Sequence, residues 1–149
     1  SVFVSFFMAA GFCAILNAES GGHLTMALQS VIWVACGGAL GAVARFGISG
    51  WLKSPMGFPW ATLSVNLLGS FFMGVLIGWL SKQSGAQEGL RLFVGVGVLG
   101  GFTTFSAFSM ELFQLLEKRE ILSVSGYLGG SLIGGLLVFA AGYLLVKGL

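Results

Sequence analysis

The segment Gly100–Ser109 holds the densest set of residues in this chain that could do chemistry. Two glycines are followed there by four hydroxyl residues and three phenylalanines within eight positions. Glycine weakens a helix, and Ser and Thr side chains offer the backbone competing hydrogen bonds, so the pattern predicts a helix break near Gly100–Thr104. In lipid, freed carbonyls must be satisfied by protein, water or an ion. The alternative is a glycine-lined packing face whose Ser and Thr bond their own backbone.

A second set of polar groups follows later in the chain. Tyr127 and Ser131 are four residues apart and therefore share one helical face, which continues to Gly135. This spacing predicts a narrow polar track through apolar surroundings. The alternative is that Ser131 only lets two helices approach closely between Gly130 and Gly134.

Arg45 and Glu111 are the charged residues that fall close to apolar stretches. An ionisable residue within a membrane is costly and usually functional. We expect Arg45 at the end of its apolar stretch. The ordinary explanation of a basic residue there is that its side chain extends to the membrane surface. Glu111 would lie just inside a span, and an acid beside an anion path must be paired, protonated or turned aside. The residues alone leave these possibilities open.

Composition identifies the solvent that must surround these groups. Of the 149 residues 56% are hydrophobic and 8% are charged, against roughly 25% charged in a soluble domain. The mean hydropathy is +0.98, and 25 glycines against 2 prolines fit helices packed closely in lipid. No basic run is long enough to hold a polyphosphate, which argues against nucleic acid as a partner. The partner is instead a lipid bilayer.

Four apolar stretches are long enough to cross roughly 30 Å of hydrocarbon, which needs about 20 helical residues. They are Leu28–Phe46, Trp60–Leu80, Leu90–Leu116 and Ile121–Val146. The predicted fold class is therefore an all-α integral membrane protein with four transmembrane helices, the third of them broken. Residues 26–149 would form this domain. Residues 1–25 would be an N-terminal extension, with an interfacial or fifth helix as the alternative.

The basic residues predict how copies of the chain assemble. Basic residues near helix ends normally gather on the cytoplasmic side. With four spans, three fall on one side and four on the other: Lys82, Arg91 and Lys147 against Arg45, Lys53, Lys118 and Arg119. A chain without this bias can insert both ways up, so we expect an antiparallel homodimer.

Three blocks, in order and at the right intervals, resemble the fluoride channels of the CrcB/Fluc family. They are Gly37–Phe46, Thr62–Phe71 and Gly100–Ser109. The resemblance extends over roughly residues 28 to 146. Two small residues depart from the family pattern, Ala61 for a frequent glycine and Ala107 for a frequent threonine, and the second removes a hydroxyl.

The resemblance implies an antiparallel dimer with two pores for fluoride, exported passively across the inner membrane of a cell. It also implies roles for individual residues. The pore would be lined by Asn66, Phe105, Ser106, Phe108, Tyr127 and Ser131, with Arg45 in an aqueous vestibule and Glu111 near the pore mouth. A structural sodium ion at the dimer axis would be bound by the main-chain carbonyls of Gly100 and Thr103 from both subunits. Carbonyl oxygens suit a hard cation, and aromatic ring edges are electropositive.

Two other classes of function fit less well. A small multidrug-type antiporter also has four spans and can form antiparallel dimers, but it needs a carboxylate in its first span, and residues 28–44 contain none. An enzyme is disfavoured because the chain has no Asp and no paired acids for acid–base or metal chemistry. The identity of the ion as fluoride rests on the resemblance alone.

Overall fold

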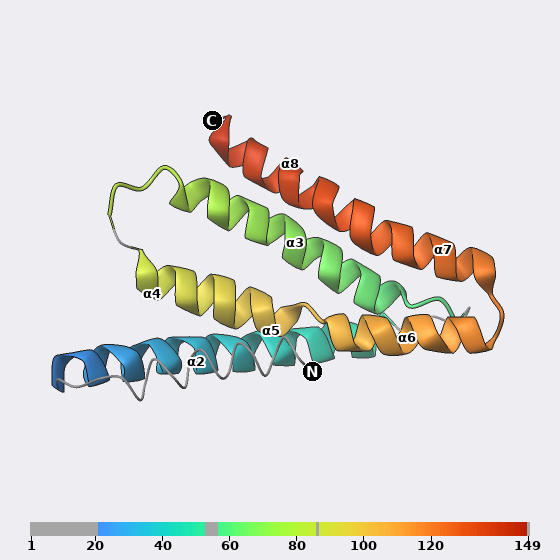
Figure 1. Cartoon of the computed structure of the whole chain (residues 1–149), viewed down its shortest axis with the longest axis horizontal. Helices are drawn as coiled ribbons and strands as arrows, with labels where there is room; N and C mark the ends of the chain where they lie inside the picture. The colour runs from blue at the N-terminus through green and yellow to red at the C-terminus, as the bar shows by residue number, and fades with distance from the viewer. Residues whose placement is uncertain (1–20, 53–56, 86, 149) are drawn as a thin grey trace.

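The computed structural model describes residues 21–52, 57–85 and 87–148, and these residues form helices joined by short connections (Figure 1). The first two spans are α2 (Gly21–Trp51) and α3 (Trp60–Leu80). The third consists of α4 (Glu88–Leu90), η1 (Arg91–Leu99), α5 (Gly100–Phe102) and α6 (Phe105–Glu117). The fourth consists of α7 (Ile121–Gly129), η2 (Gly130–Gly134) and α8 (Gly135–Lys147).

Four of these helical stretches are long and apolar enough to cross a membrane, as the sequence predicted. They are Thr25–Trp51, Trp60–Leu80, Glu88–Glu117 and Ile121–Lys147. At about 1.5 Å per residue, even the shortest, with 21 residues, reaches across the hydrocarbon of a bilayer. Successive spans run in opposite directions, so the chain crosses four times (Figure 1). The protein is therefore a multi-pass membrane protein.

The first helix is longer at both ends than the sequence suggested. We predicted a span over Leu28–Phe46, but α2 runs from Gly21 to Trp51 and crosses the expected domain boundary at residue 25 without interruption. Glycine near its end lowers helix propensity by about 1 kcal/mol but does not stop a helix as proline would. Of the predicted extension, residues 1–25, residues 1–20 lie outside the described part of the chain.

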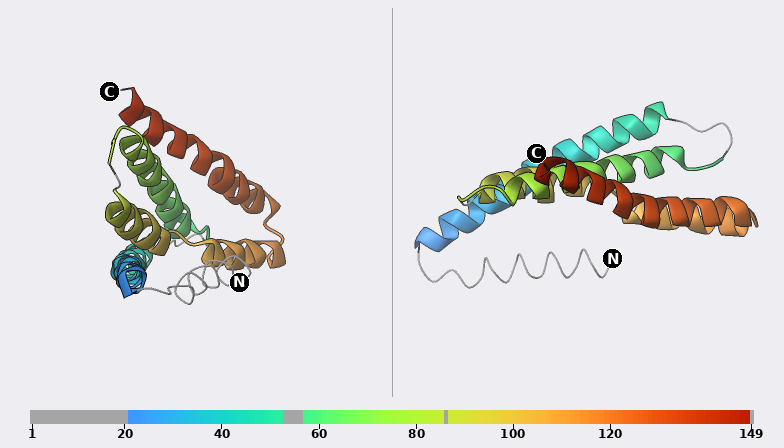
Figure 2. Two further views of the ribbon diagram at one scale, coloured as in Figure 1. Left: turned by 60° about the vertical axis from the view of Figure 1, so that its left-hand side comes forward. Right: turned by 90° about the horizontal axis from the view of Figure 1, so that it is seen from above.

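Glycines allow two pairs of spans to pack with their backbones in contact. α3 lies along α8, and α2 lies along η1 and α5 (Figures 1 and 2). A Cβ atom at Gly142 of α8 would collide with the Phe71 carbonyl oxygen of α3. A Cβ atom at Gly41 of α2 would collide with the Val98 carbonyl oxygen of η1. Small residues are what permit such close approach of helices in lipid.

The third span is broken where the sequence predicted. α5 ends at Phe102, the next two residues are extended (Thr103 φ −76°, ψ 154°; Thr104 φ −148°, ψ 122°), and α6 begins at Phe105. Figure 2 shows that the two halves run in different directions. The π-helical segments η1 and η2 were not predicted, because an extra residue in a turn leaves no mark on the apolar pattern.

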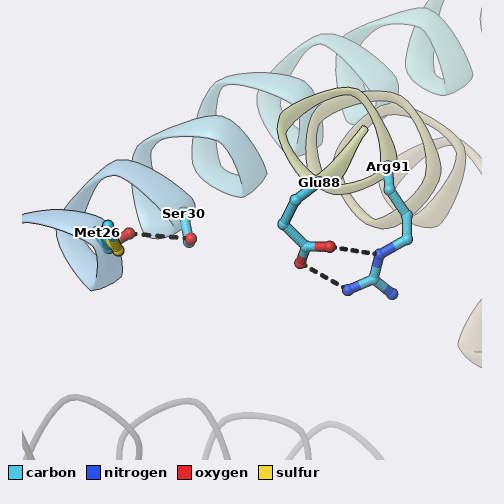
Figure 3. Close-up of polar contacts among 4 residues, drawn as sticks. All are labelled: Met26, Ser30, Glu88 and Arg91. Carbon is cyan, nitrogen blue, oxygen red and sulfur yellow. Dashed lines mark hydrogen bonds and ion pairs between the residues drawn. The ribbon is translucent and has the colours of Figure 1, made fainter. Parts of the chain in front are cut away.

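A charged pair marks the start of the third span. Arg91 Nη2 lies 2.7 Å from Glu88 Oε1, and Arg91 Nε donates to Glu88 Oε2 at 3.1 Å (Figure 3). Both side chains are about half exposed, so the pair contributes little stability. On α2, the hydroxyl of Ser30 donates to the Met26 carbonyl at 3.0 Å (Figure 3). The start of the third span, α4, lies at the end of the bundle where α3 ends and α8 finishes (Figure 1).

Candidate functional site: the polar groups around the helix break

Asn66 of α3 holds the backbone at the break. Its Oδ1 accepts a hydrogen bond from the Thr104 N–H at 2.8 Å, and its Nδ2 donates to the Thr104 carbonyl at 3.1 Å. In a continuous helix the Thr104 N–H would donate to the Gly100 carbonyl instead. The side chain of a neighbouring helix therefore satisfies backbone groups that lipid could not.

Arg45 also reaches the break, which corrects the expectation that it ends its span. α2 continues to Trp51, and the partly buried Arg45 donates from Nε to the Gly101 carbonyl at 3.3 Å. A charge that is satisfied by a carbonyl of the protein need not mark the membrane surface. The structure thus brings Arg45 and Asn66, from two different spans, to the same four-residue segment.

Thr103 and Thr104 complete the break with their own hydroxyls. The Thr103 hydroxyl donates to the Leu99 carbonyl at 3.0 Å, near the end of the first half of the span. The Thr104 hydroxyl accepts from the Ala107 N–H at 3.2 Å and so caps the N-terminus of α6. This cap satisfies one of the four orphan N–H groups with which a helix begins.

The side chain of Glu111 is hydrogen-bonded to two other spans. Its Oε1 accepts from the hydroxyl of Thr62 on α3 at 2.8 Å, and its Oε2 accepts from the hydroxyl of Tyr127 on α7 at 2.6 Å. Thr62 is 5% exposed and Tyr127 is fully buried. Two hydroxyl donors from different spans therefore share the carboxylate and fix its direction.

Phe105 and Phe108 are neighbours but occupy different environments. Their ring centroids are 5.6 Å apart, as expected for residues three apart on α6. Phe105 is 76% exposed, whereas Phe108 is 5% exposed and packs in a core cluster with Tyr127, at a ring distance of 4.9 Å, and with Leu63. The sequence left two interpretations of this pair, pore lining and core filling. Core filling describes the buried Phe108 better than the exposed Phe105.

The two serines predicted to line the pore differ in a similar way. The Ser106 hydroxyl lies 3.2 Å from the Thr104 hydroxyl, in the first turn of α6. The Ser131 hydroxyl lies in η2 and is buried, and no hydrogen-bond partner for it occurs among the described residues. A buried hydroxyl without a partner is costly, so this oxygen is a candidate for binding something that the chain itself does not supply.

Two residues with polar contacts in the candidate site were not singled out from the sequence, Thr62 and Thr104. Thr62 lies four residues before Asn66, so both lie on the face of α3 that contacts the third span. That spacing was a usable signal, since Thr62 opens the second of the three blocks. Thr104 was expected only to interrupt the helix, and nothing local indicates that a side chain 38 positions away binds both of its backbone groups.

Comparison with known proteins agrees with this architecture. Residues 32–143 match the model of the family described as CrcB-like protein, Camphor Resistance (CrcB). A protein of Sphingopyxis alaskensis named fluoride-specific ion channel FluC is 47% identical over 122 residues, which cover 80% of this chain and 97% of the relative. A protein of Gloeobacter violaceus with the same name is 48% identical over 128 residues, covering 83% of this chain and the whole relative. A third, from Thermus thermophilus, is 45% identical over 79% of this chain and 94% of the relative. The chain, with its four spans and broken third helix, belongs to the CrcB-like family.

Proposed function

We propose that this protein is a passive channel for fluoride. The relatives that match almost their whole length to this chain are named fluoride-specific ion channels. The observation in this chain that carries the proposal is the buried Ser131 hydroxyl, which no described residue satisfies. A small anion that accepts a hydrogen bond would supply the missing partner. A channel of this kind in a cell's inner membrane would let fluoride leave the cell.

The proposed path combines weak donors with aromatic ring edges. Its lining would consist of the residues that the resemblance implies: Asn66, Phe105, Ser106, Phe108, Tyr127 and Ser131. Hydroxyl and amide groups can replace hydration water without holding the ion as tightly as a lysine would. The ring edge of a phenylalanine is electropositive and adds a further weak attraction. Arg45 would attract anions into the vestibule.

The hydrogen bonds of Glu111 support an anion path that its negative charge does not block. A free carboxylate in a low-dielectric passage would repel an anion strongly. In this structure both of its oxygens are engaged by hydroxyls of Thr62 and Tyr127. Its charge is therefore partly compensated and held in one place, near the pore mouth, instead of turning freely into the passage.

The carbonyls of Gly100 and Thr103 would bind a structural sodium ion. Gly100 lacks the donor that a continuous helix would give it, because the Thr104 N–H is donated to Asn66. The Thr103 carbonyl belongs to the extended segment before α6. Carbonyl oxygens are the ligands that a hard cation prefers, and the described residues contain no cluster of three His, Cys, Asp or Glu side chains that could bind one instead. A bound cation would offset the carbonyl dipoles.

The assembly would be an antiparallel homodimer. Apolar residues of α6 and of the fourth span line an open hollow beside Phe105, a surface suited to a second copy. We predict that adding two or three lysines to the connection at 81–89 fixes the chain in one orientation and abolishes flux when the variant is expressed alone. Co-expression with a variant fixed the other way should restore flux. Full activity of one fixed variant by itself would contradict the antiparallel arrangement.

Fluoride efflux from liposomes tests the proposed function directly. Purified protein is reconstituted with internal potassium fluoride or potassium chloride, potassium is released with valinomycin, and the external anion is followed with an ion-selective electrode. We expect rapid fluoride efflux, little chloride efflux and no need for a proton gradient. Equal passage of both anions would remove the selectivity, and transport that requires a proton gradient would favour the antiporter, whose first-span carboxylate is missing from all of α2.

A further inference from the structure

Asn66 makes a contact with the break that differs from that of a simple pore donor. Both polar atoms of its side-chain amide bind one residue, with Oδ1 on the Thr104 N–H and Nδ2 on the Thr104 carbonyl. Because a backbone N–H can only donate and a carbonyl can only accept, the two bonds also fix which way the amide points. Asn66 thus replaces two backbone hydrogen bonds at the point where the helix gives up its own.

The consequence for the first half of the span concerns the Gly100 carbonyl. In a continuous helix the Thr104 N–H and the Gly100 carbonyl would be partners. By accepting that N–H, Asn66 keeps the helix from closing through Thr104 and leaves the Gly100 carbonyl available. The next carbonyl, of Gly101, is instead occupied by Arg45. Two side chains from neighbouring spans therefore determine which carbonyls at the break are engaged.

The consequence for the second half concerns where α6 begins. Thr104 is bound through its backbone by Asn66 and, through its hydroxyl, caps α6 at the Ala107 N–H. A helix that is capped by a residue held from outside starts at a fixed place and in a fixed direction. Phe105 is the first residue of that helix and Phe108 lies in its first turn. The positions of both rings therefore depend on Asn66.

We propose that Asn66 is the positioning residue of the break: its amide holds the Thr104 peptide extended, and thereby orients the Phe105–Phe108 pair and frees the Gly100 carbonyl. The effect on conduction rests on the proposed fluoride channel, but the effect on Thr104 does not. Asn66 acts here through Thr104 and not only by touching the ion.

The test reads the Thr104 peptide and the flux separately. The chain has four threonines, Thr25, Thr62, Thr103 and Thr104, so selective 15N-threonine labelling of the protein in lipid gives four backbone amide signals. Hydrogen exchange of the Thr104 amide is compared in the unmodified protein, in Asn66→Leu, which loses both bonds, and in the control Ser64→Ala on the same helix. We expect exchange at least about tenfold faster in Asn66→Leu and unchanged in Ser64→Ala. Fluoride efflux should fall at least about tenfold in Asn66→Leu only, since a mispositioned site costs that much or more.

A second variant keeps the proposal falsifiable if Asn66→Leu does not assemble. Asn66→Asp retains an acceptor for the Thr104 N–H but loses the donor to the Thr104 carbonyl, so the Thr104 amide should stay protected while efflux falls. Loss of protection as large as in Asn66→Leu would contradict the assigned bonds. Unchanged Thr104 exchange in Asn66→Leu would overturn the positioning role, and faster exchange with normal efflux would remove its link to conduction. Absence of fluoride efflux in the unmodified protein would instead defeat the proposed function, whatever Thr104 does.

Discussion

Backbone polar groups within a membrane must be hydrogen-bonded. The helix pairs packed through glycine and the polar groups at the break meet this requirement in opposite ways. Along α3 and α8 the helices keep their own hydrogen bonds and approach until Gly142 meets the Phe71 carbonyl. Around the break the third span gives up its own hydrogen bonds, and Asn66 and Arg45 replace them. We therefore expect an added atom to disturb the glycine-packed region and the loss of a polar group to disturb the break. Stability and conduction should therefore respond differently to changes in the two regions.

The largest effect is expected from an added methyl group in the glycine-packed region. Gly142→Ala would place its Cβ against the Phe71 carbonyl, and we expect the free energy of unfolding to fall by about 3 kcal/mol, the upper end of typical overpacking costs. Gly126→Ala is the matched control on the same span, because nothing lies within 4 Å of its Cβ position. SDS titration in mixed micelles measures both. If Gly142→Ala is as stable as the control, the backbone contact between α3 and α8 is not what holds this region.

A smaller effect is expected from removing one hydroxyl in the polar region. Tyr127→Phe leaves Glu111 Oε2 without its donor, and we expect a loss of about 2 kcal/mol in the free energy of unfolding, as for a buried polar group left unsatisfied. In the Glu111→Gln background the acceptor is a neutral amide, which gains less from the Tyr127 hydroxyl than a carboxylate does. The loss in free energy of unfolding caused by Tyr127→Phe should therefore be smaller there by at least about 1 kcal/mol. A double-mutant cycle in the same titration gives this coupling. Additive effects of the two changes would show that the Tyr127 hydroxyl does not stabilise the fold through Glu111.

The smallest stability effect is expected at the aromatic pair of α6, Phe105 and Phe108. Phe108→Ile removes part of a buried ring and should cost about 1 kcal/mol, while Phe105→Ile at an exposed position should stay within about 0.5 kcal/mol. Fluoride efflux should nevertheless fall about fivefold in both, since a lost ring edge is worth roughly 1 kcal/mol to the ion. Unfolding titrations and liposome efflux on the same preparations compare the two. Equal loss of stability, or normal efflux in both variants, would contradict this division of roles.

The sequence was sufficient for features that depend on local residue types. The four spans follow from apolar length, and the break follows from Gly100 and Gly101 placed before Thr103 and Thr104, whose hydroxyls do bond nearby backbone in the structure. The end of α2 was placed too early, at the end of the apolar stretch Leu28–Phe46, and Arg45 was therefore expected to reach the membrane surface. A charge shows where a helix ends only if nothing inside the protein binds it, and here the Gly101 carbonyl does.

The partners across the site could not be predicted in the same way. The carboxylate of Glu111 receives hydroxyls from residues 49 and 16 positions away, and Thr104 is bound from 38 positions away. Such contacts depend on the angle at which two spans cross and on the turn of each helix where they meet. The π-helical segments η1 and η2 change that turn, and the apolar pattern of the sequence does not report them. The roles of the pore residues remain predictions.

The position of Asn66 in the chain has a consequence for how the protein is made. Spans enter the membrane in the order of their synthesis. α2 and α3, which carry Arg45 and Asn66, therefore precede the third span, so the donors and the acceptor that its open backbone needs are already in place when Thr104 arrives. A newly inserted chain can thus satisfy the Thr104 peptide groups and the Gly101 carbonyl by itself. Each copy can therefore remain in the bilayer as a monomer until it meets another copy. This matters because the proposed partner must have been inserted in the opposite orientation.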